Sequence, residues 1–206
     1  PRKTPEAGTA NPLGVVYTIT GDEDIMATEI QTGWLAAPFE VFTFNHLLIQ
    51  LQFVCVGSAE AVAKWTAVTS IMVKNIPTEL TLSLDKTTGA SLMATGVANK
   101  SLLVKNCPAA VSVVGQATPR TGYLMLYPVA DMGTVAAAID LEVKATYGGE
   151  VKTQPVSITN IDGGVQAGQS HLITLTFAED GTIIAEAGIA VWQPGNGGSS
   201  IITPGE

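Results

Sequence analysis

The chain has 206 residues, 46% of them apolar, which is enough to build the core of one large or two small globular domains. Its formal net charge is −8, with only 10 lysines and arginines, and this argues against nucleic acid and anionic membranes, which are bound through basic patches. The sequence also lacks a run of about 18 apolar residues that would predict a membrane-spanning helix.

The first part of the chain predicts little regular structure. Residues 1–14 are rich in Pro, Gly, Thr and Asn, as expected of a linker or a chain end. Residues 15–20 predict a short strand, and residues 21–24 form a polar turn. Residues 25–38 have no clear pattern. We interpret residues 1–38 as an N-terminal extension or the remnant of a preceding sandwich domain.

A long strand is predicted over residues 39–56. The odd-numbered residues from Leu47 to Cys55 are all apolar and predict a core face, whereas the even-numbered residues from Phe42 to Gln52 form a mixed face. The alanine-rich stretch 58–65 predicts a helix of about two turns, which is too short to be stable alone.

Further strands are expected where apolar residues alternate between Gly, Pro, Asn and Asp breaks. They cover residues 68–74, 79–85, 101–105, 110–114, 123–127 and 138–147. The last has the clearest alternation, and Gly148 and Gly149 predict a turn from it onto a strand at residues 152–158.

The most ordered pattern is at the end of the chain. Residues 168–192 contain two alternating runs on either side of an Asp180-Gly181 turn, and they predict a β-hairpin whose apolar face packs on another sheet. With the strands before it, this hairpin predicts an all-β fold, an antiparallel Greek-key β-sandwich of transthyretin-like or immunoglobulin-like type, over residues 39–194. Residues 195–206 are expected to form a flexible C-terminal tail.

The residue types offer no constellation for chemistry. The spacing of Cys55 and Cys107 favours two free or buried thiols, with one disulfide as the alternative. Neither His46 nor His171 has a second histidine or cysteine at metal-ligand spacing, and we expect His46 to bond a neighbouring backbone group or water. The acids at 22–24 fit neither a glycosidase pair nor a calcium loop. We predict no catalytic residue, no cofactor, no metal and no enzyme activity.

Four segments, taken in their order along the chain, form a recognisable pattern. They are the strand 44–53, which reads Phe-x-His-x-Leu-x-x-Leu from Phe44, the segment 65–77, the strand 123–128 and the closing hairpin 167–192. This pattern resembles the fimbrillin family, the type V pilin subunits and related surface proteins of Bacteroidales. Members often have an aromatic residue where His171 stands, and a complete N-terminal sandwich precedes their Phe-x-His strand. The resemblance therefore implies that this chain is mainly the C-terminal domain or a reduced version of the family plan.

The resemblance also implies a function. It implies an extracellular location at the cell surface, associated with the outer membrane, and a role as a structural subunit or a tip or accessory component of fimbriae that supports adhesion. Subunits of the family pass a strand between neighbours, so the implied partners are other fimbrial subunits joined by β-augmentation. Ile201 and Ile202 are the only large apolar residues after Trp192, and they are the strand-exchange candidates.

A second interpretation stays open, in which the chain is a secreted β-sandwich module that binds a glycan or a host surface ligand. Such a module needs exposed aromatic rings, and Trp34 and Trp65 are the candidate ligand contacts. Packing of these rings in the core is the alternative for both residues.

Overall fold

The computed structural model describes residues 14–34, 36–37, 40–85, 89–115 and 121–192. Nearly all regular structure in these ranges is β-strand. In chain order the elements are β1 (Val15–Thr18), β2 (Met26–Ala27), β3 (Asn45–His46), β4 (Ile49–Gly57), α1 (Ala59–Lys64), β5 (Trp65–Ile76), β6 (Glu79–Asp85), β7 (Gly89–Ala94), β8 (Lys100–Leu103), β9 (Ser112–Val113), β10 (Gly122–Leu126), β11 (Thr134–Tyr147), β12 (Glu150–Asn160), β13 (Ser170–Phe177) and β14 (Ile183–Ala190).

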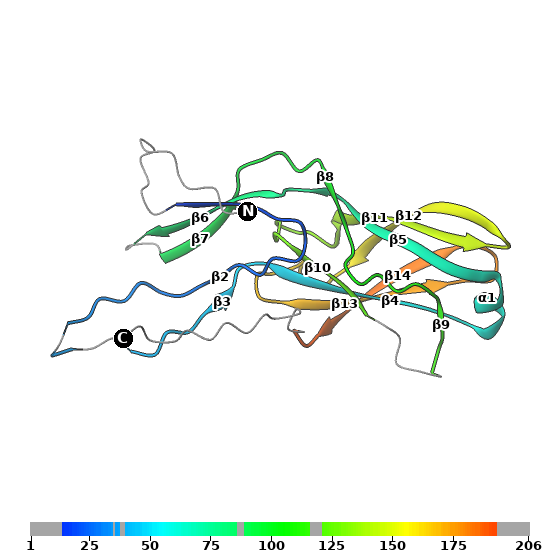
Figure 1. Ribbon diagram of the computed structural model, residues 1–206, viewed down its shortest axis with the longest axis horizontal. Helices are drawn as coiled ribbons and strands as arrows, with labels where there is room; N and C mark the ends of the chain where they lie inside the picture. Colours follow the sequence, from blue (N-terminus) through cyan, green and yellow to red (C-terminus); the bar gives the residue numbers. More distant parts are fainter. Residues whose placement is uncertain (1–13, 35, 38–39, 86–88, 116–120, 193–206) are drawn as a thin grey trace, which may run out of the picture.

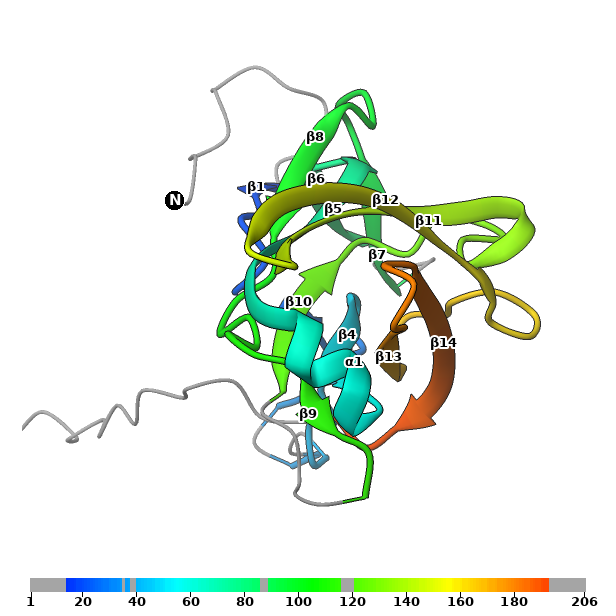
Figure 2. The same cartoon turned by 90° about the vertical axis from the view of Figure 1, so that its right-hand side faces the viewer.

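Two sheets pack face to face and form the body of the molecule. Sheet I has the order β10-β4-β13-β14, with β9 also paired to β4, and sheet II has the order β12-β11-β5-β8. Figure 1 shows this sandwich with α1 at its right-hand end, and Figure 2 looks along the sandwich from that end. The predicted all-β sandwich is therefore confirmed.

The core lies between the two sheets and follows the two-residue period of the strands. In β4, Ile49, Leu51, Phe53 and Cys55 are fully buried, as the odd-numbered face predicts. They pack with the inward residues of β5, β11 and β13 in one continuous cluster. Each large apolar side chain buried in this way contributes about 1.5–3 kcal/mol to folding. Cys55 and Cys107 are both free thiols.

The single strand predicted over residues 39–56 is wrong, because the chain changes partner at residues 47 and 48. Residues before this point pair with β2, and the Leu47 N–H donates to the carbonyl of Ile25. The Leu48 carbonyl accepts from Gly168 N–H, after which β4 runs beside β13. The side chain of Leu48 is fully buried, but it packs in a different core from Ile49.

The strands are also not all antiparallel. The pairing of β4 with β13 is parallel from Gln50 and Ser170 to Gly57 and Phe177, and the short β9 is parallel to β4. The predicted closing hairpin is present as the antiparallel pair β13 and β14.

A third sheet lies beside the sandwich and covers a second, smaller core (Figure 1). Sheet III has the order β1-β6-β7, in which β7 was not predicted from the sequence. Leu80 and Leu82 of β6 are buried with Ile19, Ile25 and Leu48. Met125 of β10 joins this second core, whereas its neighbours Leu124 and Leu126 face the sandwich core. Sheet I therefore has apolar side chains buried on both faces.

The predicted short helix is present as α1. Ser58 is its N-cap, and the Ser58 hydroxyl accepts a hydrogen bond from Ala61 N–H at 3.1 Å. Ala61 is buried, which ties this short helix to the sandwich core. The helix ends where β5 begins at Trp65.

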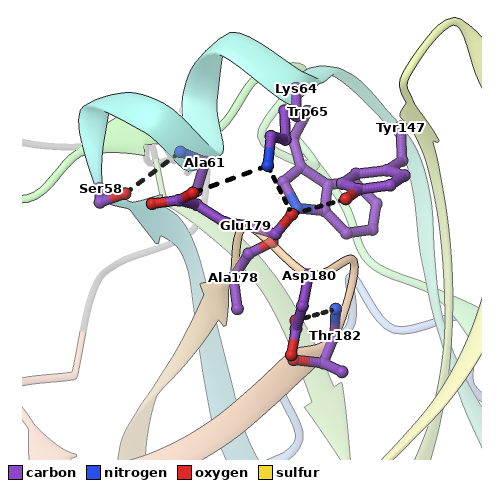
Figure 3. A network of polar contacts seen from close by, with 9 residues as sticks. All are labelled: Ser58, Ala61, Lys64, Trp65, Tyr147, Ala178, Glu179, Asp180 and Thr182. Atoms are coloured by element: carbon purple, nitrogen blue, oxygen red, sulfur yellow. Dashed lines mark hydrogen bonds and ion pairs between the residues drawn. The ribbon is translucent and has the colours of Figure 1, made fainter.

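Trp65 fastens α1 to both sheets (Figure 3). Its indole is 1% exposed and lies 4.7 Å from the Tyr147 ring and 5.0 Å from the Phe177 ring, measured between centroids. The Trp65 Nε1 donates to the Ala178 carbonyl at 2.8 Å, and the Tyr147 hydroxyl donates to the Glu179 carbonyl. These bonds hold the β13–β14 turn against the end of β11.

This arrangement gives a first stability prediction. Replacing Tyr147 by Phe removes the hydroxyl but keeps the ring against Trp65, so the free energy of unfolding should fall by about 0.5–1.5 kcal/mol. Urea denaturation followed by fluorescence measures this. Tyr127→Phe is the matched control, because the Tyr127 hydroxyl has no hydrogen bond among the described residues. Equal stability of the two variants would contradict the assigned role of the Tyr147 hydroxyl.

Candidate functional site

The surfaces that suit interaction gather at the end of the molecule opposite α1. There, residues 26–34, 36–37 and 40–46 leave the body as a hairpin, which we call the arm, and sheet III lies next to it (Figure 1). At the base of the arm, β2 pairs with β3 through Met26 with His46 and Ala27 with Asn45. Near the tip, Trp34 and Ala37 exchange two backbone hydrogen bonds, of 3.0 and 2.9 Å.

His46 fastens the base of the arm to two distant parts of the chain. Its Nδ1 lies 2.8 Å from a carboxylate oxygen of Asp24. Its ring stacks on the ring of Trp192 at 4.0 Å between centroids and 25° between planes. We call this cluster of Asp24, His46 and Trp192 the clasp. It joins the arm to the segment that follows β14.

A buried polar network on sheet I supports the same segment. Gln50, Gln52 and Ser170 are all buried although they lie on the face of sheet I opposite the sandwich core. The Gln52 amide nitrogen lies 2.9 Å from the Ser170 hydroxyl and 2.8 Å from the Val191 carbonyl. The Ser170 hydroxyl in turn donates to Gln50 Oε1 at 3.0 Å. Buried polar groups need such partners, so this network fixes where the chain crosses sheet I.

The acidic turn at residues 22–24 is divided among separate partners. Asp22 pairs with the Lys105 ammonium at 3.2 Å and accepts from the Tyr123 hydroxyl. Burial disfavours ionisation of Glu23, but hydrogen bonds from Thr20 and Gly21 outweigh it and hold its pKa below the ordinary value. Asp24 belongs to the clasp. The three carboxylates thus hold the chain in place and do not converge on one point.

The arm encloses a hollow of about 650 Å³. Trp34 lies at one end of it, and Thr28, Thr43 and Asn45 line it nearer the body. The Gln31 side chain spans the hairpin and accepts from Glu40 N–H at 2.9 Å. The Trp34 side chain is one of the most exposed large apolar groups in the described chain, at 68%.

Sheet III has an open edge at β7, and its apolar face is only partly covered near that edge. Its inward residues change from buried at Leu80 and Leu82 to half-buried at Leu84, at the end of β6, and at Ala90 and Leu92 of β7. In the described part of the chain, β7 pairs with β6 on one side and with no strand on the other. An unpaired edge of this kind is a template for another strand.

Two edges of the main sandwich are better protected than the edge at β7. On one side, the segment from β8 to β9 crosses between the sheets, where Val104 N–H donates to the Ile71 carbonyl and Lys105 pairs with Tyr123. On the other side, Lys152 of the edge strand β12 points inward and lies 4.4 Å from the Tyr147 ring centroid. Inward-pointing charges on edge strands oppose pairing with other chains.

His171 is a buried polar residue in the sandwich. It is 2% exposed on the inward face of β13, and its Nε2 has no hydrogen-bond partner among the described residues. Burial lowers the pKa of His171, because the charged ring cannot be solvated there. The neutral ring therefore fills a position that a hydrocarbon ring of similar size could occupy.

The two tryptophans predicted from the sequence as ligand contacts differ in exposure. Trp34 is exposed on the arm, as a ligand contact requires. Trp65 is buried against Tyr147 and Phe177, so its ring offers no face to a ligand, and core packing is correct for this residue. Ile201 and Ile202 lie outside the described residues. In the described chain, no group of three His, Cys, Asp or Glu side chains could hold a metal ion.

The clasp was missed by sequence reasoning. His46 was expected to bond backbone or water, but its partners are side chains far away along the chain, Asp24 and Trp192. The only signal was the position of Trp192 directly after the last predicted strand, where a large ring must find a surface.

The clasp gives a second prediction. His46→Ala removes both the stacking on Trp192 and the contact with Asp24, and should lower the free energy of unfolding by about 1–2 kcal/mol. His46→Phe keeps the stacking and should lose less. Chemical denaturation measures both variants. Equal losses in the two would show that ring stacking contributes nothing to the clasp.

His171 gives a third prediction, on pH. Because its pKa is lowered in the folded state, the unfolded chain takes up a proton that the folded chain does not as the pH falls below about 6.5, so stability falls in acid. His171→Phe removes this loss and the unpaired nitrogen. The variant should be at least as stable as the parent at pH 7.5, and should lose less stability between pH 7.5 and pH 5.5. An identical pH dependence would contradict the burial of a neutral ring.

Comparison with known proteins identifies the family. Residues 21–192 match the family described as fimbrillin-like. Among solved structures, the chain is similar to a candidate cell adhesion protein from Bacteroides uniformis, with a TM-score of 0.61 and 17% identity over 92% of this chain and 70% of that chain. It is also similar to the tip fimbrial protein Mfa3 from Porphyromonas gingivalis with C-terminal truncation, with a TM-score of 0.42 and 11% identity over 79% of this chain and 60% of that chain.

A comparison with curated proteins finds no match. At 17% identity, the similarity to the Bacteroides uniformis structure supports the fold alone. In the described chain, no helix is long and apolar enough to cross a membrane. The family match, however, spans far more than half of the sequence, and the chain therefore belongs to the fimbrillin-like family.

Proposed function

We propose that this protein is a structural subunit, or a tip or accessory component, of cell-surface fimbriae, and that it supports adhesion. The observation that carries the proposal is the fimbrillin-like match over residues 21–192. It implies a place outside the cell, at the outer membrane surface, with other fimbrial subunits as partners. A non-catalytic role agrees with the acidic turn 22–24, whose carboxylates are each engaged in holding the fold.

Assembly is proposed to occur by β-strand addition at the open edge of sheet III. A strand from a neighbouring subunit would continue the sheet beyond β7, and its alternate apolar side chains would cover the half-buried Ala90 and Leu92. Backbone hydrogen bonds supply affinity in this mode, and the side-chain pockets supply specificity. The guarded edges of the sandwich favour sheet III over β12 as the acceptor.

Ile201 and Ile202 are proposed as the strand-exchange residues that this chain offers to a neighbour. We also propose a division into an extension at residues 1–38, a fimbrillin-like domain at 39–194 and a tail at 195–206. The extension is more than a spacer, because Ile19 and Ile25 are buried in the second core.

Strand addition is tested by placing a charge on the acceptor edge. Leu92→Lys puts an ammonium on the inward face of β7, where its long stem can still reach water, so the fold should persist while strand addition is blocked. Purified chain is mixed with the other subunits of the same fimbria, and heat-resistant ladders are read on gels of unboiled samples. The parent should form ladders and Leu92→Lys should not.

Ile189→Lys is the matched control, because it adds the same charge to the exposed part of the sandwich strand β14. It should form ladders like the parent, and thermal unfolding should be similar in both variants. Ladders from Leu92→Lys would exclude β7 as the acceptor edge, and no ladders from the parent with any subunit would overturn assembly by strand addition.

A further inference from the structure

We propose that the hollow of the arm is a binding site for a neutral glycan. The proposal does not depend on strand addition, because it concerns the arm and not the edge of sheet III. It rests on the exposed ring at the tip, on the free polar groups that line the hollow and on the charges around it.

Trp34 has a fixed backbone and a free ring. Two backbone hydrogen bonds to Ala37 hold its main chain, whereas its side chain is 68% exposed. The other two tryptophans contact aromatic rings of the protein: Trp192 stacks on His46, and Trp65 packs at an angle against Tyr147. Trp34 has no such aromatic partner in the described chain. An indole presented to water in this way offers a flat apolar face, which is the surface on which the C–H face of a pyranose ring stacks.

The groups next to this ring suit hydroxyl ligands. Thr28, Thr32, Thr43 and Asn45 line the hollow with three hydroxyl groups and one amide. None of these side chains has a hydrogen bond within the described chain. As far as the described residues go, they are therefore available to donate to and accept from a ligand. The volume of about 650 Å³ lies within the range of small-molecule sites and admits one or a few sugar rings.

The charges around the hollow favour neutral glycans over anionic ones. Among the described residues, Glu29 and Glu40 are the ionisable groups in the lining, and no lysine, arginine or histidine of this part of the chain lies there. Two carboxylates repel sialic acid and sulfate groups, but they accept hydrogen bonds well from the hydroxyl groups of a neutral sugar. A lysine-rich peptide could also meet these carboxylates and the Trp34 ring. The four free neutral side chains favour hydroxyl recognition over such a peptide.

A second hollow, of about 430 Å³, lies on the outer face of sheet II and lacks these properties. There Lys74 pairs with Glu142 at 3.4 Å, and the Ser157 hydroxyl donates to Asp140 at 2.8 Å. Its charged side chains therefore already have partners.

The experiment titrates the purified chain with maltotriose, chitotriose, mannotriose, lactose and sialyl-lactose, and follows tryptophan fluorescence and calorimetric heat. At least one of the neutral sugars should bind and change the emission of Trp34, and sialyl-lactose should bind more weakly than lactose. Binding should change little between low and high salt, because no ion pair forms. Trp34→Ala should weaken binding by about tenfold or more, and Trp34→Phe should restore part of it.

Phe44→Ala is the matched control, because Phe44 is an exposed aromatic residue of the arm that does not line the hollow. It should bind like the parent. The proposal is overturned if no neutral sugar binds, or if Trp34→Ala binds as tightly as the parent. It is also overturned if only an oligolysine peptide binds, with an affinity that salt abolishes, since the site would then be one for cationic peptides.

Discussion

The structure depends on the parallel pairing of β4 with β13. This pair lies at the centre of sheet I, and its register places Leu51 beside His171 and Phe53 beside Ile173. Because side chains alternate, the same register sends Gln52 and Ser170 to the opposite face, where they hold the segment at Val191. A shift by one residue would move the polar network into the sandwich core and the apolar face out of it. One pairing therefore fixes the core and the path of the chain toward the clasp.

Alternation in the sequence was enough to predict most strands and the faces that they bury. It placed β6 over Glu79–Asp85 and the inward face of β4 correctly, because each depends only on neighbours along the chain. Alternation says which face of a strand is buried, but not which strand lies beside it. The parallel neighbour of β4, which comes from the far end of the sequence, could not be found in this way.

The failures have the same origin. At Leu47 and Leu48 the apolar pattern continues although the chain passes from one core to the other, so a single strand was predicted. Trp34 stands between Gly33 and Leu35, and Trp65 between Lys64 and Thr66, and neither setting tells whether the ring is buried. Only the tertiary structure separates the ring that fastens α1 from the ring that faces water. The clasp requires three segments that no local pattern connects.

The position of the clasp has a mechanical consequence. A surface organelle that holds a cell against flow carries tension along its length. Because His46 stacks on Trp192 at the root of the arm, a pull between the arm and the residues after β14 would load this stack and its contact with Asp24 first. The hydrogen-bonded ladders of the sandwich lie outside that line of force. The body can then stay folded while this small junction opens and closes again.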